Sequence, residues 1–335
     1  MQRWNLPAEG TTPGDLRYEE VATPDPGPGQ VRIKVGALSI NARDSMILSV
    51  PGFGRSPGED IVPLSDVAGT VDALGEGVTG LAVGDAVTVA HVPTWVDGRP
   101  PLFAQGAGST GDPGFAAEQI VVDAGRVVPA PPHLSIAEAS TLQIAGVTAW
   151  NCLFGAKPVA AGDTVVILGS GGVSLFAAQV AVALGARVFA AVRSNAENPR
   201  WSELGVSGVI TTGEGWGRGM SDLTGDGATK VVDSVGPGLT PECMDALAPG
   251  GEVAIAGLMD MAMPALDSGA LIGRQISVRG VAVGSVAMHR ALSDFVAEHG
   301  IHPVVHARVP FAEVPRAYEV LAERGVFGKI LIDLP

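Results

Sequence analysis

A glycine-rich run in the middle of the chain is well suited to hold a ligand; it reads Leu168-Gly169-Ser170-Gly171-Gly172-Val173-Ser174. Gly169 permits a tight turn, and Gly171 lets the backbone come close to a pyrophosphate. A helix that begins at Gly172 offers unpaired N–H groups and partial positive charge. Ser174 stands where a third glycine is common, and its hydroxyl is small enough to pack there or to bond a phosphate. The run predicts a dinucleotide site; the alternative is a structural turn without a ligand.

The elements on either side of this turn are those expected around a dinucleotide-binding turn. Thr164–Leu168 is a continuous apolar run, typical of a strand buried on both faces, and residues 172–184 are typical of a helix packed on a sheet. Further strand-like runs follow at residues 187–192, 208–210, 230–233, 252–256 and 277–283. Strands that alternate with helices predict a parallel, doubly wound sheet. We therefore expect an α/β chain in which residues 128–285 form a nucleotide-binding domain.

The end of the second strand determines which dinucleotide fits. A carboxylate there would accept hydrogen bonds from the ribose 2′-OH of NAD, but none occurs before Glu197. Arg193 and Ser194 stand there instead, close to the spacing of about 20 residues expected after the glycine turn. A guanidinium beside a hydroxyl suits a 2′-phosphate. We predict NADPH rather than NADH; the alternative for Arg193 is a solvated loop residue.

The two ends of the chain have a different pattern of predicted secondary structure. Residues 1–127 consist of short strands with frequent turns, such as the alternating run Val31–Val35. Residues 92–114 carry four Pro and five Gly and predict a long loop. Residues 286–335 are too few for a domain and are expected to fold back onto the N-terminal part. We therefore expect residues 1–127 and 286–335 to form one β-rich domain.

Composition excludes several classes of protein. The 335 residues carry 21 Lys and Arg against 35 Asp and Glu, a net charge of −14, which argues against nucleic-acid binding. Two cysteines cannot build a disulfide framework. No apolar stretch is long enough to span a membrane, and the N-terminus lacks the apolar region of a signal peptide. We expect a cytoplasmic protein with a small-molecule partner, without nucleic acid or membrane.

Several spaced motifs occur in a fixed order: SINARD at 39–44, SDVAGTV at 65–71, GEGV at 75–78, VGD at 83–85, PGFAAE at 113–118, AGVTAW at 145–150, VGS at 283–285 and FGK at 327–329. With these motifs the whole chain resembles the medium-chain dehydrogenase/reductase superfamily, in its zinc-free, quinone-oxidoreductase-like branch. The resemblance implies a GroES-like catalytic domain, a Rossmann domain inserted before the last segment, and a cleft between them for the nicotinamide. It also implies a homodimer, with residues 277–283 as a candidate sheet edge.

The same resemblance indicates that zinc ligands are missing. Asn41 stands at the position of a cysteine ligand, and Ser65-Asp66 stand at that of a His-Glu pair. The loop at 92–114 has no cysteine for a structural zinc. A tetrahedral zinc site needs Cys, His or carboxylate ligands in number. We therefore expect no metal.

The resemblance implies Asn41, Arg43 and Asp44 as catalytic residues. Asn41 could hold the substrate carbonyl oxygen or the nicotinamide ribose. Arg43 and Asp44 could form a charged pair at the cleft, or an ion pair that only fixes the loop. Some relatives place a Tyr a few residues after the Asn, but this chain has Met46 there. Its two tyrosines lie elsewhere in the sequence, so a solvent proton is the simplest proton source.

Further cofactor contacts are implied at the ends of later strands and in both domains: Thr148, Ser234, Gly257, Gly284, Ser285 and Lys329. Gly284 and Ser285 would meet the carboxamide, and Lys329 would neutralise phosphate or ribose contacts. The alternative for each is an ordinary turn or packing residue.

The sequence thus predicts an NADPH-dependent, zinc-independent oxidoreductase that transfers hydride to a quinone or an α,β-unsaturated carbonyl (enone). Without a Lewis acid, hydride addition to an electron-poor acceptor remains accessible. Two alternatives remain: a zinc-free alcohol dehydrogenase or carbonyl reductase, and a non-catalytic NADPH-binding protein.

Overall fold

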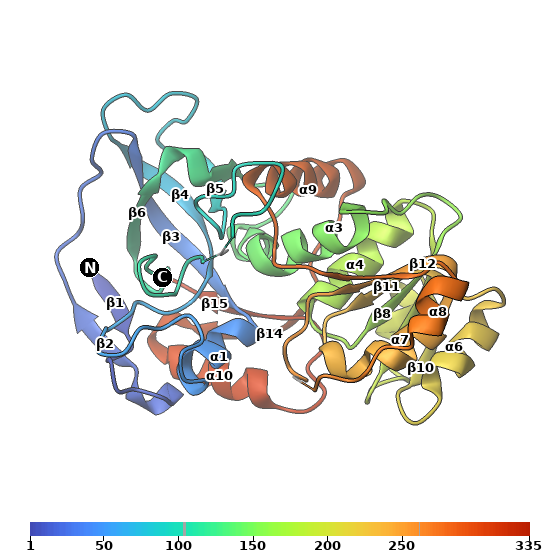
Figure 1. Cartoon of the computed structure of the whole chain (residues 1–335). Helices are drawn as coiled ribbons and strands as arrows, with labels where there is room; N and C mark the ends of the chain where they lie inside the picture. The colour runs from blue at the N-terminus through green and yellow to red at the C-terminus, as the bar shows by residue number, and fades with distance from the viewer. Residues whose placement is uncertain (103–104, 261) are drawn as a thin grey trace. The chain divides into compact units, whose positions relative to one another are not determined.

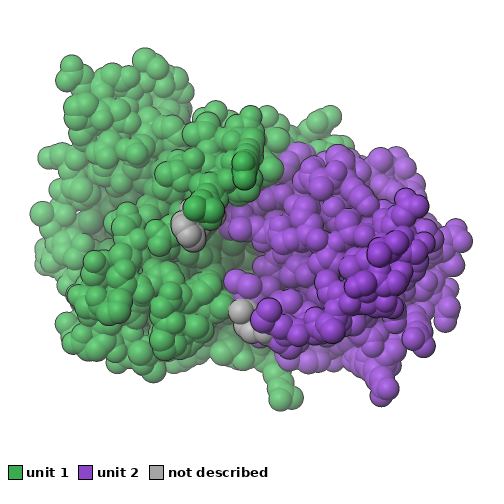
Figure 2. All heavy atoms as spheres, in the orientation of Figure 1, with its two compact units in different colours: residues 1–147, 284–335 green, residues 148–283 purple. Residues whose placement is uncertain are grey.

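The computed structural model describes residues 1–102, 105–260 and 262–335. This part of the chain divides into two compact units, coloured in Figure 2: unit 1 is Met1–Val147 with Gly284–Pro335, and unit 2 is Thr148–Val283. Residues 128–147, which the sequence analysis grouped with the parallel sheet, belong to unit 1. The reason is that strand β7 (Val127–Pro129) pairs antiparallel with β5 (Ala86–Val89) of that unit.

Unit 1 is built on a mixed seven-stranded sheet with the order β14-β15-β3-β4-β5-β7, and β6 also pairs with β3. Besides β5 and β7, its strands are β3 (Gln30–Ile40), β4 (Asp66–Leu74), β6 (Gln119–Asp123), β14 (Val305–Pro310) and β15 (Lys329–Asp333). The C-terminal strand β15 lies beside β3, and β14 pairs with the other edge of β15 (Figure 1). The prediction that the tail folds back is therefore confirmed. The antiparallel register sets Ile330 opposite Ile40, which brings Lys329 to the end of β3.

Smaller elements complete unit 1. They are β1 (Gln2–Asn5), β2 (Arg17–Glu20), α1 (Ala42–Ser49), α2 (Ile136–Ala139), a π-helical turn at Leu142–Gly146, α9 (Val286–His299), α10 (Val314–Ala322) and short 3₁₀ turns at Pro13–Asp15, Ala124–Arg126 and Phe311–Glu313. Helix α3 (Val147–Phe154) begins at the last residue before the chain enters unit 2.

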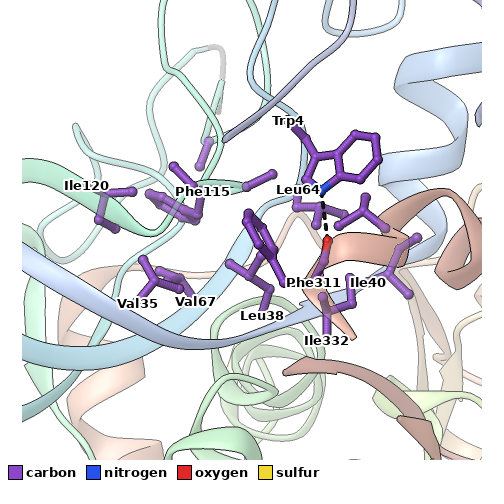
Figure 3. Packing of buried hydrophobic residues seen from close by; sticks show 14 of the residues in the cluster. Trp4, Val35, Leu38, Ile40, Leu64, Val67, Phe115, Ile120, Phe311 and Ile332 are labelled. Carbon is purple, nitrogen blue, oxygen red and sulfur yellow. Dashed lines mark hydrogen bonds between the residues drawn. The ribbon is translucent and has the colours of Figure 1, made fainter. Parts of the chain in front are cut away.

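The core of unit 1 follows the alternation of β3, in which Val31, Ile33 and Val35 are buried while Lys34 is exposed. Period-two burial is what places one face of a strand against a core. Figure 3 shows Val35 of this strand in one apolar cluster with aromatic side chains from distant parts of the chain, among them Trp4 and Phe311. There the Trp4 indole N–H donates to the Phe311 carbonyl at 2.8 Å, so the buried polar edge of the ring is paired.

Unit 2 is a doubly wound α/β fold, as the sequence predicts. Its six strands are all parallel and have the order β10-β9-β8-β11-β12-β13. They are β8 (Thr164–Leu168), β9 (Arg187–Val192), β10 (Val206–Thr211), β11 (Ala228–Asp233), β12 (Leu247–Ile255) and β13 (Ser277–Gly280), and the connections include α4 (Gly172–Ala183), α5 (Arg200–Glu203), α6 (Trp216–Thr224), a 3₁₀ turn at Pro237–Leu239, α7 (Thr240–Asp245) and α8 (Ser268–Gly273). Strand β8, at the centre, is buried along its whole length. A sheet with helices on its faces requires such continuously apolar strands.

Strand β13, predicted as an edge strand, is the last in the sheet order. In the part of the chain that the structure describes, no helix has the length and apolar character that a membrane span requires.

Candidate functional site

The predicted phosphate-binding turn lies between β8 and α4. Gly169 has φ +81°, a conformation that glycine adopts without strain, and α4 begins directly after Gly171. An added Cβ at Gly171 would meet no heavy atom within 4 Å, so the backbone there faces open space. Gly172 and Val173 form the first turn of a helix of 12 residues. Open space in front of a helix N-terminus is what a pyrophosphate needs, so the turn fits the predicted dinucleotide.

Two of the predicted cofactor residues, Ser174 and Ser234, stabilise the turn by hydrogen bonds to its backbone. The Ser174 hydroxyl donates to the Leu168 carbonyl and lies 2.8 Å from the Ser234 hydroxyl, which also donates to that carbonyl. Ser174 is fully buried. Its oxygen therefore joins the end of β8 to the end of β11 rather than facing a phosphate. Gly257 follows β12, and a Cβ there would lie 2.3 Å from the Ser234 carbonyl carbon, so only glycine allows this close approach.

The residues predicted to select the cofactor lie together after β9. Arg193 and Ser194 are both exposed, and Arg193 forms no hydrogen bond or ion pair with residues 1–102, 105–260 or 262–335. The loop behind them is fixed: Asn195 has φ +65°, and its carbonyl accepts a hydrogen bond of 2.9 Å from the Trp201 indole. An uncommitted guanidinium on a fixed loop suits an anionic group.

Sequence reasoning missed Asp233, the last residue of β11. One carboxylate oxygen accepts the N–H groups of Val235 and Gly236 at 2.8 and 2.9 Å, while the other is buried without a partner among the described residues. Burial raises the pKa of Asp233 to about 6, although the two backbone N–H groups act in the opposite direction. An aspartate that ends an apolar strand was the available signal.

In unit 1, Asn41 lies at the centre of a closed buried cluster. Its amide N–H₂ donates to Asp66 at 2.8 Å, and its amide oxygen accepts from the Lys329 ammonium at 2.6 Å. Lys329 also donates to Asp66 and to the Ile40 carbonyl, and Asp66 further accepts from Ser39 and from the backbone N–H of Ile144. All the side chains concerned are buried. The cluster therefore uses both polar ends of the Asn41 side chain internally.

Arg43 and Asp44 form a second cluster beside the first. Arg43 Nη1 donates to the Ser65 hydroxyl and to the Ala107 carbonyl, and Nη2 donates to the Ser109 hydroxyl at 3.2 Å. Asp44 accepts from Ser65 at 2.5 Å and from the Asn41 backbone N–H at 2.8 Å, while its nearest guanidinium contact is 3.9 Å. Burial raises the pKa of Asp44, and Arg43 opposes that shift. The three predicted catalytic residues thus lie together.

Ser65 is held by an unusual backbone. Leu64, directly before it, is buried and has φ +70°, and its carbonyl accepts the Phe115 N–H at 2.9 Å. A bulky residue in the left-handed region costs on the order of 1–3 kcal/mol and persists only when the surroundings enforce it. This backbone conformation directly precedes Ser65, which bridges Arg43 and Asp44.

Two further titratable side chains lie near Arg43, and the sequence analysis did not select them. His91 is buried, and burial, then Arg43 and Arg126, hold its pKa well below the usual value. Neither ring nitrogen of His91 has a partner in the described ranges. Tyr318 is buried too, and burial followed by the charge of Asp44 raises its pKa well above the usual value. Neither residue could be found from the sequence, because His91 and Tyr318 lie far from Arg43 along the chain and only the fold brings them close to it.

The remaining predicted cofactor residues are mostly buried. Thr148 is buried in α3 of unit 2. Gly284 and Ser285 precede α9 in unit 1, where the Ser285 hydroxyl accepts the Met288 N–H at 3.1 Å as an N-cap. Lys329 is 4% exposed, and its ammonium is committed to the Asn41 cluster. The predicted cofactor residues thus fall in both units.

The donor set of unit 1 does not suit a zinc ion. The Asn41 cluster offers an amide oxygen and one carboxylate, with the Lys329 ammonium already hydrogen-bonded to both. The neighbouring cluster adds the Asp44 carboxylate, which accepts from Ser65 and the Asn41 N–H, together with the Arg43 guanidinium. Zinc prefers thiolate, imidazole and carboxylate ligands in a tetrahedral arrangement. Across residues 1–102, 105–260 and 262–335, no group of three or more His, Cys, Asp or Glu is placed to hold a metal ion.

Known proteins share this architecture. Residues 27–132 match the family described as alcohol dehydrogenase GroES-like domain, and residues 172–298 match the one described as zinc-binding dehydrogenase. A zinc-type alcohol dehydrogenase-like protein of Schizosaccharomyces pombe is 34% identical over 332 residues, 95% of each chain. An NAD-dependent alcohol dehydrogenase of known structure is 30% identical, with a TM-score of 0.89 over 100% of both chains. A crotonyl-CoA carboxylase/reductase in complex with NADP is 24% identical, has a TM-score of 0.88 over 99% of this chain and 94% of its own, and shows the fold alone.

The two family matches and the similarity along the whole chain agree with the β-rich unit 1 and the parallel sheet of unit 2. They also agree with the glycine turn that precedes α4. The chain belongs to the medium-chain dehydrogenase/reductase superfamily: it is an oxidoreductase with GroES-like and Rossmann parts, in a fold that binds a nicotinamide cofactor.

Proposed function

We propose that this oxidoreductase uses NADPH, without zinc, to transfer hydride to a quinone or an enone. The observation that carries the proposal is the Lys329 ammonium, hydrogen-bonded to Asn41 at 2.6 Å and to Asp66 at 3.1 Å. Because like charges repel, this buried ammonium opposes the binding of a zinc cation at the same place. The alcohol chemistry that depends on a Lewis-acidic metal then loses its main driver, whereas hydride addition to an electron-poor acceptor does not.

The cofactor choice is supported by the loop after β9. Arg193 is exposed and uncommitted within the described residues, and Ser194 lies next to it. Gly169, Ser170, Gly171 and Gly172 would hold the pyrophosphate, and Arg193 with Ser194 would hold the 2′-phosphate. The reduced nicotinamide, when bound, supplies the hydride.

A zinc-free alcohol dehydrogenase or carbonyl reductase is the second candidate. The alcohol dehydrogenase-like relative from Schizosaccharomyces pombe and the NAD-dependent alcohol dehydrogenase favour it. Initial rates on quinones, enones, aldehydes and alcohols, each with NADP(H) and NAD(H), separate the two. We expect NADPH-dependent reduction of quinones or enones to be fastest. Alcohol oxidation as the fastest reaction would favour the second candidate, and tight NADPH binding without any turnover would indicate a non-catalytic protein.

A homodimer through β13 is part of the proposal. This strand lies at the edge of its sheet, and Ile272 in the preceding helix α8 is 78% exposed. An exposed strand edge beside apolar side chains favours pairing with a second copy. Light scattering after gel filtration should give twice the chain mass, and Ile272→Asp should shift it toward the monomer.

A further inference from the structure

We propose that Arg43 binds the oxygen atom of the substrate and stabilises the negative charge that develops on it during hydride transfer. The proposal deepens the function proposed above and rests on it. It also gives Asn41 a different part from the one expected from the sequence, as a residue that positions its neighbours.

The Arg43 guanidinium is held in one orientation. Its Nη1 group is bonded to the Ser65 hydroxyl and to the Ala107 carbonyl, and its Nη2 group is bonded to Ser109 at 3.2 Å. Ser65 is in turn fixed by Asp44 at 2.5 Å and by the strained backbone of Leu64. A charged group that is already ordered loses little entropy when a ligand arrives, which is the condition for electrostatic preorganisation.

The same guanidinium keeps unused hydrogen-bonding capacity. Arginine has five N–H donors. In Arg43, the Nη1 and Nη2 atoms make three hydrogen bonds. Its Nε donates to nothing within residues 1–102, 105–260 and 262–335. The side chain is 18% exposed. Two donors on a fixed, partly exposed fork match the lone pairs of one oxygen.

Arg126 in the same unit provides a contrast. Its Nε, Nη1 and Nη2 atoms are bonded to the Ala90 and His91 carbonyls and to both oxygens of Asp112, at 2.8 to 3.2 Å. Arg126 is buried and serves to hold the chain. The polar side-chain atoms of Asn41 and Lys329 are likewise hydrogen-bonded to each other and to Asp66. Among these groups, Arg43 is the one with a nitrogen atom, Nε, that donates to no described residue.

The charge of Arg43 is only partly balanced by its neighbour. The Asp44 carboxylate faces Ser65 and the Asn41 backbone, at 2.5 and 2.8 Å, and stays 3.9 Å from the guanidinium. There is thus no bidentate ion pair that would take up both edges of the fork. The Nε edge therefore has no hydrogen-bonded carboxylate among the described residues, and a developing oxyanion beside it would gain most in a site of low dielectric.

The chemistry requires such a group. An enone accepts the hydride at its β-carbon from the reduced nicotinamide, and the C=C electron pair shifts to give an enolate with its charge on oxygen. The α-carbon then takes one proton from water, which completes the saturated ketone and leaves the oxidised cofactor. A quinone accepts the same hydride and one proton to give the hydroquinone. In both cases the oxygen anion forms in the step that Arg43 would assist.

The test compares Arg43→Gln and Arg43→Lys with the wild-type protein on the fastest enone or quinone of the panel. Arg55→Gln is the matched control, because among the described residues the Arg55 guanidinium donates only to the carbonyls of Pro7, Ala8 and Gly10. Arg43→Gln should lower kcat by about 10²–10³-fold, the range for loss of an oxyanion donor, with the NADPH Kd unchanged by calorimetry. Arg43→Lys keeps the charge but loses the fork, and its kcat should fall by about tenfold or more.

Guanidinium chloride at millimolar concentration should restore part of the kcat of Arg43→Ala, and methylammonium should restore less. A kcat within twofold of wild type in Arg43→Gln, or in Arg43→Lys should the Gln variant not fold, would overturn the inference while leaving the proposed function intact. A wild-type protein that binds NADPH but reduces no quinone or enone would instead defeat the proposed function itself.

Discussion

At the scale of single residues, this chain shows how hydrogen-bond saturation separates structural from reactive groups. Asn41, Lys329 and Asp66 satisfy one another in a buried site, whereas Arg193 and one side of Arg43 keep donors without partners in the described chain. Buried polar groups are stable only when paired, so removing one member of a closed cluster costs stability. Removing a residue with spare donors should cost binding or turnover instead.

The closed cluster leads to a prediction about stability. Lys329→Met should lower the free energy of unfolding by roughly 3–5 kcal/mol, because it leaves the Asp66 carboxylate buried without its cation. Urea denaturation at pH 7 measures this. Lys34→Met is the matched control, since Lys34 is exposed in the same sheet and should change stability by about 0.5 kcal/mol or less. Equal effects of the two substitutions would contradict the role given to Lys329.

The exposed arginine leads to a prediction about the cofactor. Arg193→Ala should weaken NADPH by about 10–100-fold and leave NADH unchanged, because only NADPH carries the 2′-phosphate that a charged hydrogen bond would hold. Calorimetric titration with both cofactors gives the ratio. Arg218→Ala serves as control, as the Arg218 side chain is 84% exposed and Asp245 is its one ion-pair partner in the part of the chain that the structure describes. If NADPH and NADH weaken together in Arg193→Ala, the selection of NADPH at this position is wrong.

Asp233 makes stability depend on pH. Its folded pKa of about 6 lies above the ordinary 3.8, so the folded state holds a proton that the unfolded state has lost between these values. The contribution of Asp233 to stability is therefore greatest below pH 3.8 and declines as pH rises through 6, by about 3 kcal/mol in all. Asp233→Asn should be more stable relative to wild type at pH 7.5 than at pH 4.5. Urea denaturation of both proteins at the two pH values tests this, and a pH-independent difference would contradict the shift.

At the scale of elements, the turn between β8 and α4 combines two glycines with different tasks. Gly169 is needed for its positive φ, while Gly171 has φ −80° and an open side on which a side chain would meet nothing in the protein. Strand β8 ends at the buried Leu168 and helix α4 begins at Gly172, so only three residues lie in between and their conformational freedom is small. Stability and ligand binding are therefore separable within this one turn.

Gly171→Ala should bind NADPH at least about tenfold more weakly with its melting temperature unchanged, because the methyl group fits the protein but occupies the space for the pyrophosphate. Gly169→Ala should unfold more easily by about 1 kcal/mol or more, since alanine is strained at φ +81°. Gly125→Ala, at another open glycine in unit 1, controls for the substitution itself. Unchanged NADPH affinity in Gly171→Ala would place the phosphates elsewhere.

At the scale of the whole molecule, the chain consists of two compact units that are joined at residues 147–148 and 283–284. Each has its own sheet, and apolar clusters pack on both sheets. The proposed independence from zinc is a property of this whole arrangement, because Lys329 reaches Asn41 only after the C-terminal strand returns to unit 1.

Metal removal tests that independence. We expect dialysis against a chelator to change neither the rate of NADPH oxidation nor the melting temperature, because the donor groups of unit 1 are engaged with ammonium and guanidinium groups. Elemental analysis of the purified protein should find far less than one zinc per chain. Stoichiometric zinc, or activity that a chelator abolishes and zinc restores, would overturn the proposal.

The sequence alone determined the elements and their class. Apolar runs such as Thr164–Leu168 and the alternation of Val31–Val35 depend on local periodicity, so the strands, the glycine turn and the doubly wound sheet were predictable. The tertiary structure decided which hydrogen bonds the side chains of the site form. The ammonium of Lys329 meets Asn41 across 288 residues, and the hydroxyl of Ser174 turns inward to the β8 carbonyl instead of outward to a phosphate. A side chain's hydrogen bonds depend on which distant segments pack beside it, and periodicity along the chain carries no information about that.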